Sequence, residues 1–381
     1  MSNSLRGIRD WLEGPAKNVA SQNPRANLVR GAVARLTTPL LPDDYLHLVN
    51  PLWSARELRG RIVDVRKETG DSVTLTIRTG WGFTPHYQPG QYIGIGVLLG
   101  GRWTWRSYSL TSVPEHQDGR APSEVSITVK AMAEGFLSSH LVNGVAPGTV
   151  VRLQAPAGDF TLPNPLPEKI LFLTAGSGIT PVMSMLRTLD RRGIPADTDI
   201  IAVHSAPDAD SALFREELAE FDASHAGVTV RMRYTRETGR LTPGNIGEAV
   251  PDWAERETWI CGPGAFLSDM EQAWQAKGIF DRLHQERFTV ERADVSASGG
   301  EVHFAKSDKT IEVDGATTLL EAGEAQGVQM PFGCRMGICQ TCVVQLTEGQ
   351  TRDLRSGDLH VEGERIQTCI AVAVGDCTLD V

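Results

Sequence analysis

Four cysteines near the end of the chain constrain its fold more than any other feature of the sequence. Cys334, Cys339 and Cys342 follow the spacing C-x4-C-x2-C, and Cys369 lies a short distance downstream. A 2Fe-2S cluster needs four thiolates, and three of them can come from one compact loop while the fourth comes from another segment. A glycine such as Gly337 lets that loop curl close to the cluster. The spacing therefore predicts an iron–sulfur site.

A zinc site and a set of buried structural cysteines are the alternatives for this pattern. Zinc sites usually pair two short Cys or His spacings, and this chain has only one. Six cysteines in 381 residues do not make a disulfide scaffold. The two that remain outside the predicted ligand set, Cys261 and Cys377, suit a reducing compartment.

Length and composition indicate a globular protein of two or three domains. The 381 residues are 41% hydrophobic and 22% charged, as in ordinary water-soluble domains. No apolar run reaches 18 residues, and the N-terminus lacks the apolar region of a secretory signal. We therefore expect no membrane span and a cytoplasmic location.

The net charge of −10 is unevenly distributed along the chain. Residues 300–381 carry 13 acidic and 6 basic side chains, whereas residues 1–59 carry 8 basic and 5 acidic ones. An acidic cluster domain favours a basic docking partner through electrostatic steering, although acidity also serves solubility. The sequence has no basic field for nucleic acid.

Residues 1–58 form a predicted N-terminal helical extension without a catalytic motif. Within it, residues 24–36 place apolar side chains on one helical face and arginines elsewhere. Such a helix packs on the next domain or touches a membrane surface, and both alternatives stay open.

Residues 59–165 read as a small antiparallel β-barrel, because short alternating runs are separated by Gly and Pro turns. Residues 166–293 then alternate apolar strands with helices, which predicts a doubly wound α/β nucleotide-binding domain. Residues 294–300 form a small, polar linker. Residues 301–381 form the cysteine-containing α+β domain. The predicted barrel strands are residues 61–66, 72–78, 92–97 and 123–130.

Arg106-Ser107-Tyr108-Ser109 resembles the flavin motif R-x-Y-S/T of the ferredoxin–NADP reductase superfamily. Four such residues alone fit an ordinary β-surface. The motif lies, however, between a Pro-Gly-Gln-Tyr stretch at 89–92 and a Gly-x-x-Ser element at Gly135 and Ser138, as in that family. The resemblance implies that Arg106 pairs with flavin phosphate, Tyr108 lies against the isoalloxazine and Ser109 binds near its reactive nitrogen. The 135–138 element would hold a pyrophosphate at a helix N-terminus.

A glycine-rich turn after the apolar strand at 169–175 has the form that this superfamily uses for nicotinamide dinucleotides. Glycines there let the pyrophosphate approach the backbone and the helix N-terminus. A Cys-Gly-Pro element after a later strand would lie beside the nicotinamide, where the cysteine shapes hydride geometry; the alternative is a buried small side chain. The residues so assigned are Gly176, Ser177, Gly178, Thr180, Cys261, Gly262 and Pro263.

The choice between NADPH and NADH depends on a short arginine-containing segment. Thr235 and Arg236 look like the family's S-R-E segment, which grips the 2′-phosphate of NADP, and Arg240 offers a second contact. Ser205 and Ala206, rather than an acidic residue, follow the strand predicted at 200–204. These features favour NADPH, although the same arginines also suit salt bridges, and NADH remains the alternative.

Together these motifs resemble single-chain reductases with a C-terminal plant-type ferredoxin domain of β-grasp fold. The pyrophosphate element favours FAD, with FMN as the alternative. The resemblance implies that the flavin accepts a hydride from the nicotinamide and passes single electrons to the 2Fe-2S cluster. The sequence does not support a catalytic Ser-His-Asp triad or a catalytic pair of carboxylates.

The electron acceptor is inferred from resemblance. The basic N-terminal stretch and the family favour a terminal oxygenase at the membrane, namely a di-iron acyl desaturase or hydroxylase. The reductase of a soluble Rieske or other multicomponent oxygenase is one alternative, and a redox-sensing or scaffold protein with low turnover is another. Arg335, Met336 and Ile338 in the cysteine loop are candidate docking residues.

Overall fold

A computed structural model describes most of the chain from residue 49 onward. The chain divides into two compact units, Met1–Arg240 and Leu241–Val381, and each has its own architecture. The predicted helix at 24–36 lies outside the described residues, as does most of the linker predicted at 294–300. The described residues are 49–53, 57–83, 86–99, 102–114, 123–131, 136–288, 299–315, 317–332, 337, 340–354 and 357–381.

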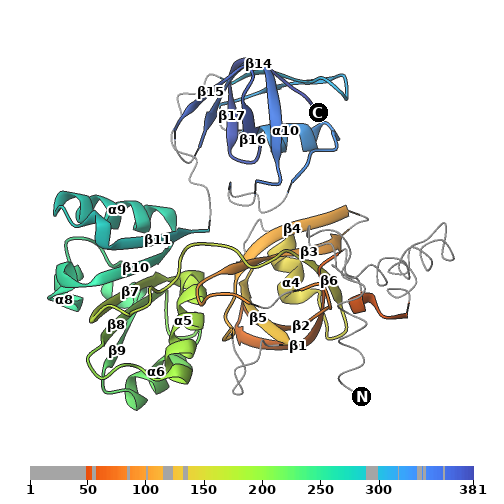
Figure 1. The fold of residues 1–381 in the computed structure, drawn as a ribbon. Helices are drawn as coiled ribbons and strands as arrows, with labels where there is room; N and C mark the ends of the chain where they lie inside the picture. Colours follow the sequence, from red (N-terminus) through yellow and green to blue (C-terminus); the bar gives the residue numbers. More distant parts are fainter. Residues whose placement is uncertain are drawn as a thin grey trace, which may run out of the picture. The chain divides into compact units, whose positions relative to one another are not determined.

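The first unit begins with a six-stranded antiparallel sheet in the order β4-β3-β6-β1-β2-β5 (Figure 1). Leu110, the residue after β4, bridges to Ile127 of β5, so the two ends of this order meet and the sheet closes into the predicted barrel. Alternate apolar side chains, among them Leu75 and Ile93, fill its interior. The strands are β1 (Arg59–Thr69), β2 (Ser72–Thr79), β3 (Tyr92–Leu99), β4 (Arg102–Ser109), β5 (Glu124–Lys130) and β6 (Val150–Leu153).

The short 3-10 helix η1 (Pro51–Trp53) precedes the first barrel strand and packs against the barrel. The Trp53 ring stacks on the Trp81 ring with centroids 5.1 Å apart, and the backbone N–H of Trp81 donates to the carbonyl oxygen of Leu52 at 3.0 Å. Leu52 itself is buried. Leu52 and Trp53 are therefore part of the barrel's packing.

Parallel strands follow the barrel in the first unit. β7 (Lys169–Ala175) pairs with β8 (Asp199–Ala206), and β8 pairs with β9 (Val228–Tyr234). The middle five residues of β7 are buried, as expected for a parallel strand that is covered on both faces. The helices of this region are α5 (Ile179–Arg192), α6 (Arg215–Ser224) and the single turn α7 (Thr235–Thr238).

The second unit begins with the remaining part of the nucleotide-binding segment. β10 (Glu257–Gly262) and β11 (Leu283–Arg287) are parallel, and the complete sheet has the order β11-β10-β7-β8-β9. The domain limits predicted from the sequence stay predictions. The helical segments here are α8 (Ile246–Ala249), η3 (Trp253–Glu255), α9 (Gly264–Ala276) and η4 (Phe280–Arg282).

The cysteine-containing region is a mixed sheet in the order β13-β12-β17-β14-β15, with β16 paired to β14. β12 and β13 form an antiparallel hairpin, and β12 runs parallel to β17. A separate apolar core, which includes Phe304, Leu319 and Leu346, joins α10 to the sheet. The elements are β12 (Gly300–Phe304), β13 (Lys309–Val313), α10 (Leu319–Ala325), β14 (Val343–Asp353), β15 (Leu359–Val361), β16 (Arg365–Gln367) and β17 (Ala371–Leu379).

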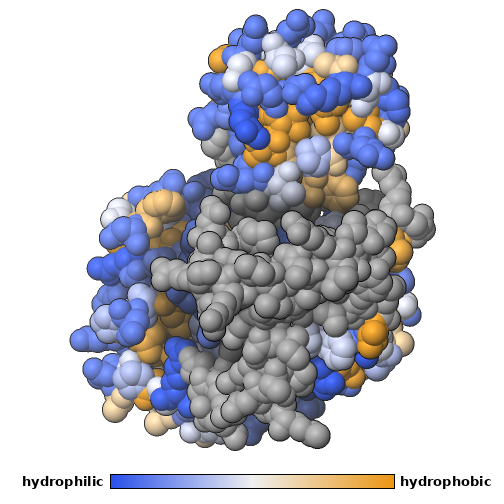
Figure 2. Space-filling view, turned by 45° about the vertical axis from the view of Figure 1, so that its right-hand side comes forward, coloured by the Kyte–Doolittle hydropathy of each residue, from blue (hydrophilic) through white to orange (hydrophobic). Residues whose placement is uncertain are grey.

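On the face of the cysteine-containing region that Figure 2 shows, an apolar area is surrounded by hydrophilic residues. Leu359 and Val361, on the sheet-edge strand β15, are each 43% exposed. No helix among the described residues is long and apolar enough to cross a membrane.

Candidate functional site

The predicted flavin motif lies within strand β4. From the sequence, the motif is expected to follow a barrel strand and to lie outside the four predicted strands; in the structure, Arg106 to Ser109 are the last four residues of β4, paired antiparallel to β3. Tyr92, the last residue of the Pro-Gly-Gln-Tyr stretch, lies opposite Ser109 in this register. The strand pairing therefore brings together the two sequence elements that the resemblance assigns to the flavin.

Side chains alternate along β4, so Arg106 and Tyr108 lie on one face and Ser107 and Ser109 on the other. Arg106 is exposed, and its guanidinium donates to the carbonyl oxygen of Trp105 at 2.8 Å. Tyr108 packs against the barrel core, and burial raises the pKa of its phenol well above 10. Tyr108 therefore stays protonated and neutral at physiological pH.

The hydroxyl oxygens of Ser107 and Ser109 are buried and have no hydrogen-bond partner among the described residues. A buried hydroxyl without a partner costs free energy, and a bound polar group removes that cost. A flavin at β4 would supply such partners, so these two serines fit the cofactor assigned to this motif.

Helix α4 (Phe136–Asn143) begins where the second flavin-phosphate element was predicted. Leu137 and Leu141 anchor it in the barrel core, and Ser138 lies in its first turn, 9% exposed. The first backbone N–H groups of a helix lack intrahelical acceptors and attract phosphate oxygens. Gly135 lies outside the described residues, so its part in the element stays a prediction.

The glycine turn connects β7 directly to α5. Gly176 has φ +56°, and an added Cβ would meet no atom within 4 Å, so the need for glycine there is conformational. Gly178 is the N-cap residue of α5, and the buried Thr180 donates its hydroxyl to the Ser177 carbonyl at 2.9 Å. These contacts hold the turn in the form in which a helix N-terminus meets a pyrophosphate.

A buried histidine beside this turn escaped the sequence analysis. His204 pairs with Thr174 across β7 and β8, and its Nδ1 lies 2.9 Å from the Thr174 hydroxyl. Its Nε2 has no partner among the described residues, and burial lowers its pKa to about 4. His204 is therefore a neutral side chain at the carboxyl end of the sheet; its position in an apolar strand gave no signal in the sequence.

The side chain of Arg233 holds the backbone of the predicted 2′-phosphate segment. Thr235 and Arg236 open α7, and Arg233 donates to the carbonyl oxygens of Gly239 at 3.0 Å and Thr238 at 2.8 Å. Arg240 follows as an exposed side chain. The segment thus presents arginines at the end of β9, as the sequence predicted.

An acidic residue near this segment was missed, because β8 extends two residues beyond the predicted strand end. Asp208 lies just past Ala206 and forms an ion pair with Arg236. Hydrogen bonds from Ser211, together with the charge of Arg236, lower the pKa of Asp208. The Arg236 backbone N–H also donates to the Pro207 carbonyl at 3.1 Å. A 2′-phosphate would therefore meet an arginine that already has a carboxylate partner.

The Cys-Gly-Pro element spans the end of β10 and the start of α9. Cys261 and Gly262 end the strand, and Pro263 is the N-cap residue of the helix. Burial, with the nearby Glu286 carboxylate, raises the pKa of the Cys261 thiol well above 9. Cys261 is therefore a protonated, fully buried side chain that contributes shape rather than nucleophilic chemistry.

Two of the four predicted cluster ligands meet in the cysteine-containing region. The Sγ atoms of Cys342 and Cys369 lie 3.2 Å apart, and both cysteines are buried. Gly337, whose φ of +72° favours glycine, donates its N–H to Cys369 Sγ at 3.3 Å. Adjacent sulfurs with a backbone donor suit thiolates that share a metal cluster, so this part of the site fits 2Fe-2S.

The remaining ligands, Cys334 and Cys339, lie outside the described residues, as do Arg335, Met336 and Ile338. The four-cysteine ligand set and this docking loop thus stay predictions. Within the described part of the chain, no group of three or more His, Cys, Asp or Glu residues could hold a metal ion.

Three family models match consecutive parts of the chain, in the order of the architecture above. An oxidoreductase FAD-binding domain matches residues 71–162, an oxidoreductase NAD-binding domain matches 172–272 and a 2Fe-2S iron-sulfur cluster binding domain matches 302–374. The chain belongs to the ferredoxin–NADP reductase superfamily, as a reductase with a C-terminal 2Fe-2S domain. It is a flavin- and iron-sulfur-dependent NAD(P)H oxidoreductase.

Individual relatives agree with this class. An NADPH oxidoreductase of Mycobacterium tuberculosis is 59% identical over 95% of this chain and 94% of its own. A glycine betaine monooxygenase reductase subunit of Pseudomonas aeruginosa is 28% identical over 88% of this chain and 99% of its own. The solved structure of phthalate dioxygenase reductase matches 85% of this chain and 98% of its own, with a TM-score of 0.61 and 21% identity, which shows a shared fold.

Proposed function

We propose that this protein is an NADPH-dependent reductase that passes electrons through FAD and a 2Fe-2S cluster to a terminal oxygenase. The observation that carries the proposal is the presence, in one chain, of flavin, nicotinamide and cluster domains. When bound, the flavin converts the hydride of a nicotinamide into electrons that a one-electron cluster can carry. The route runs from the nicotinamide through the flavin to the cluster, although the flavin domain precedes the nicotinamide domain in the chain.

The side chains of the two nucleotide-binding regions have binding and orienting roles in this proposal. Arg106 binds flavin phosphate, Gly135 and Ser138 bind its pyrophosphate, and Ser107 makes a further contact with the cofactor. Tyr108 and Ser109 orient the ring. The turn at 176–180 binds the nicotinamide dinucleotide, and Cys261, Gly262 and Pro263 bound its nicotinamide end. Cys334, Cys339, Cys342 and Cys369 hold the cluster.

NADPH is preferred to NADH in this proposal for two reasons. Thr235, Arg236 and Arg240 follow β9, where a 2′-phosphate would bind. The 59%-identical relative is an NADPH oxidoreductase. Asp208 lowers the expected preference, because its carboxylate competes with the phosphate for Arg236.

A membrane di-iron acyl desaturase or hydroxylase is the proposed acceptor. Residues 1–58 precede all three family models, and residues 1–59 carry more basic than acidic side chains. Basic segments are attracted to anionic lipid surfaces. The acidic cluster domain, with its apolar area inside a hydrophilic surround, suits a basic partner surface (Figure 2). The proposed compartment is the cytoplasm, because a reducing environment suits the buried thiols of Cys261 and Cys377.

A soluble multicomponent oxygenase is the second candidate acceptor. It is favoured by relatives whose names identify them as reductase subunits of a glycine betaine monooxygenase and of a stachydrine N-demethylase. This alternative needs no role for residues 1–48. The soluble oxygenase differs from the membrane acceptor in the protein surface through which it receives electrons. The electron route up to the cluster is the same for both acceptors.

Deletion of residues 1–48 separates these acceptors and leaves the packed segment 49–53 in place. With a reconstituted membrane desaturase, we expect electron delivery to fall by about tenfold or more, because membrane recruitment is lost. Cytochrome c reduction should stay within about twofold of the full chain, since its electrons need no membrane contact.

An unchanged rate with the membrane acceptor would favour the soluble oxygenase. Negligible cytochrome c turnover by the full chain, with flavin and cluster intact, would instead support the low-turnover sensor or scaffold. The same assay with NADPH and NADH measures nucleotide preference; equal kcat/KM values would contradict the NADPH proposal.

A further inference from the structure

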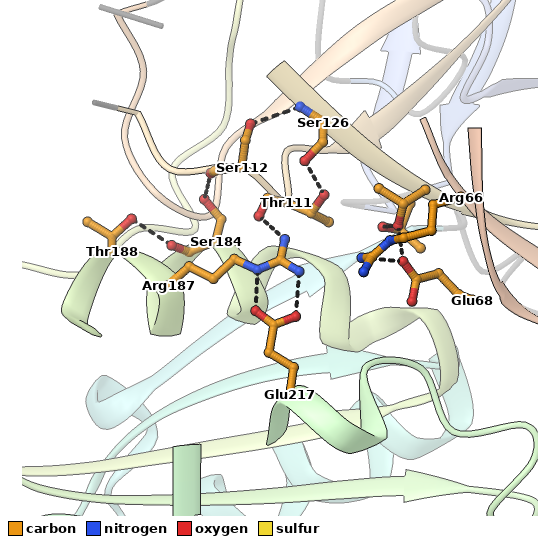
Figure 3. Close-up of polar contacts among 11 residues, drawn as sticks. Arg66, Glu68, Thr111, Ser112, Ser126, Ser184, Arg187, Thr188 and Glu217 are labelled. Carbon is orange, nitrogen blue, oxygen red and sulfur yellow. Dashed lines mark hydrogen bonds and ion pairs between the residues drawn. The ribbon is translucent and has the colours of Figure 1, made fainter. Parts of the chain in front are cut away.

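Helix α5 is held to the barrel by an arginine that contacts two other segments of the chain (Figure 3). The Arg187 guanidinium donates to the carbonyl oxygen of Thr111 at 2.5 Å. The same group donates to both carboxylate oxygens of Glu217, on α6, at 2.6 Å each. Arg187 thus joins the barrel to two helices of the nucleotide-binding region.

A second contact lies one turn earlier on the same helix. The Ser184 hydroxyl donates to the carbonyl oxygen of Ser112 at 2.8 Å. The Ser112 hydroxyl in turn lies 2.8 Å from the Tyr87 hydroxyl and accepts from the Ser126 N–H at 2.9 Å, both within the barrel. Residues 111 and 112 are therefore held from the α5 side and from the barrel side at once (Figure 3).

The chain positions of these contacts give them functional meaning. Thr111 and Ser112 follow the flavin motif on β4 after only Leu110. Ser184 and Arg187 lie on the helix that begins directly after the glycine turn. The contacts therefore connect the strand that would hold the flavin to the turn that would hold the nicotinamide nucleotide. Only Leu110 separates the flavin motif from Thr111, and helix α5 itself connects the turn to Ser184 and Arg187.

Burial makes the arginine contact strong. The side chain of Arg187 is only 18% exposed, and its guanidinium lies 5.1 Å from the Phe214 ring centroid. A guanidinium bound by two parallel N–H groups to a carboxylate has a fixed orientation. Loss of Arg187 would leave the Glu217 carboxylate and the buried Thr111 carbonyl without this partner.

We propose that Arg187 is a positioning residue for hydride delivery, which sets the flavin strand β4 relative to the glycine turn. Ser184 and Glu217 act with it. The proposal rests on NAD(P)H-dependent flavin reduction and is independent of nucleotide preference and of the terminal acceptor. It adds no chemical step, because Arg187 acts through the backbone of residue 111 and the carboxylate of residue 217.

Arg187→Ala tests the proposal in the flavin-loaded full chain by stopped-flow flavin reduction. We expect the limiting rate at saturating nucleotide to fall about tenfold or more, since small misplacements of reacting groups are costly. The dissociation constant of the nucleotide and the bound flavin content should change by less than about threefold. NADPH and NADH should be affected alike.

Hydrogen exchange gives a readout that is independent of turnover. In the flavin-free and flavin-loaded forms of Arg187→Ala, amides of residues 110–112 and 184–188 should exchange faster than in the wild type, because the contact between them is opened. Glu217→Gln and Ser184→Ala should shift rate and exchange in the same direction by less. These two variants serve as the test if Arg187→Ala does not fold.

Arg78→Ala is the matched control, because Arg78 forms an arginine–glutamate ion pair with Glu124 on the barrel surface, 2.8 Å long. It should leave the limiting rate and the exchange of residues 110–112 unchanged. A limiting rate within twofold of wild type in Arg187→Ala would overturn the proposal. So would a fall in rate fully explained by lost flavin, or an equal fall in Arg78→Ala.

Discussion

Cys342 and Cys369 show at the residue scale how distant cysteines come together. The Thr368 hydroxyl donates to the Cys342 carbonyl at 3.0 Å, and the Thr368 N–H donates to the same oxygen at 3.2 Å. These bonds hold the neighbouring Cys369 beside the start of β14. Both cysteines are buried, so the fold brings two of the predicted ligands together inside the cluster region.

Cys369→Ala should remove the visible absorbance of the 2Fe-2S cluster, because one of four thiolate ligands is lost. Cytochrome c reduction should fall about tenfold or more, whereas NADPH-dependent flavin reduction should stay within about twofold. Absorbance spectroscopy and stopped-flow kinetics measure the two effects.

Cys377→Ala is the control, since Cys377 is also buried in this region but lies outside the predicted ligand set. Its cluster absorbance should be retained. An equal loss of flavin reduction in Cys369→Ala would contradict a linear route from flavin to cluster.

His204 predicts a pH dependence of stability. Burial lowers the folded-state pKa of His204 from 6.5 to about 4. Between pH 4 and pH 6.5, the unfolded chain therefore binds a proton at this residue and the folded chain does not. The contribution of His204 to the free energy of unfolding is present above pH 6.5 and is lost as the pH falls towards 4. The free energy of unfolding should drop by about 2 kcal/mol between pH 7 and pH 5 from this residue alone.

Urea unfolding followed by tryptophan fluorescence measures this slope. His204→Asn removes the titrating group and can still bond to Thr174, so the drop between pH 7 and pH 5 should shrink by about the same amount. An identical pH slope in the variant and the wild type would show that other groups cause the dependence.

At the element scale, short local signals define where the functional helices begin. α5 starts at a glycine turn, and α10 starts at a capping box in which Glu321 N–H donates to Thr318 Oγ at 3.3 Å and Thr318 N–H donates to Glu321 at 3.1 Å. Such caps satisfy backbone groups that the helix itself leaves unbonded. Helix starts are therefore readable from sequence where a cap is present.

Thr318→Ala should lower the stability of the cluster region by about 1 kcal/mol, because the N-terminus of α10 loses its hydroxyl cap. The thermal midpoint for loss of cluster absorbance measures the change. Thr318→Ser keeps the cap and should lie close to wild type. If the Ser and Ala variants were equally destabilised, packing of the threonine methyl group, and not the cap, would be the cause.

At the scale of the whole molecule, the barrel and the cluster region each have a core of their own. The apolar cluster of the barrel contains only residues between 58 and 153, and that of the cluster region only residues between 302 and 381. Each cofactor therefore has an independently packed support.

The sequence alone determined the order of the three domains and most of the elements that carry their motifs. Cysteine spacing, the glycine turn and the alternation of β2 and β5 are local patterns, and local patterns report on local structure. The strand position of Arg106–Ser109 and the full length of β8 were missed, because pairing with neighbouring strands decides where a strand ends.

The tertiary structure alone decided which distant side chains meet. Arg187 contacts Thr111 and Glu217, Asp208 pairs with Arg236, and His204 is buried beside Thr174. None of these pairs is close in sequence, and each depends on how strands and helices pack. A single sequence contains no signal for such contacts, because burial and orientation are properties of the assembled core.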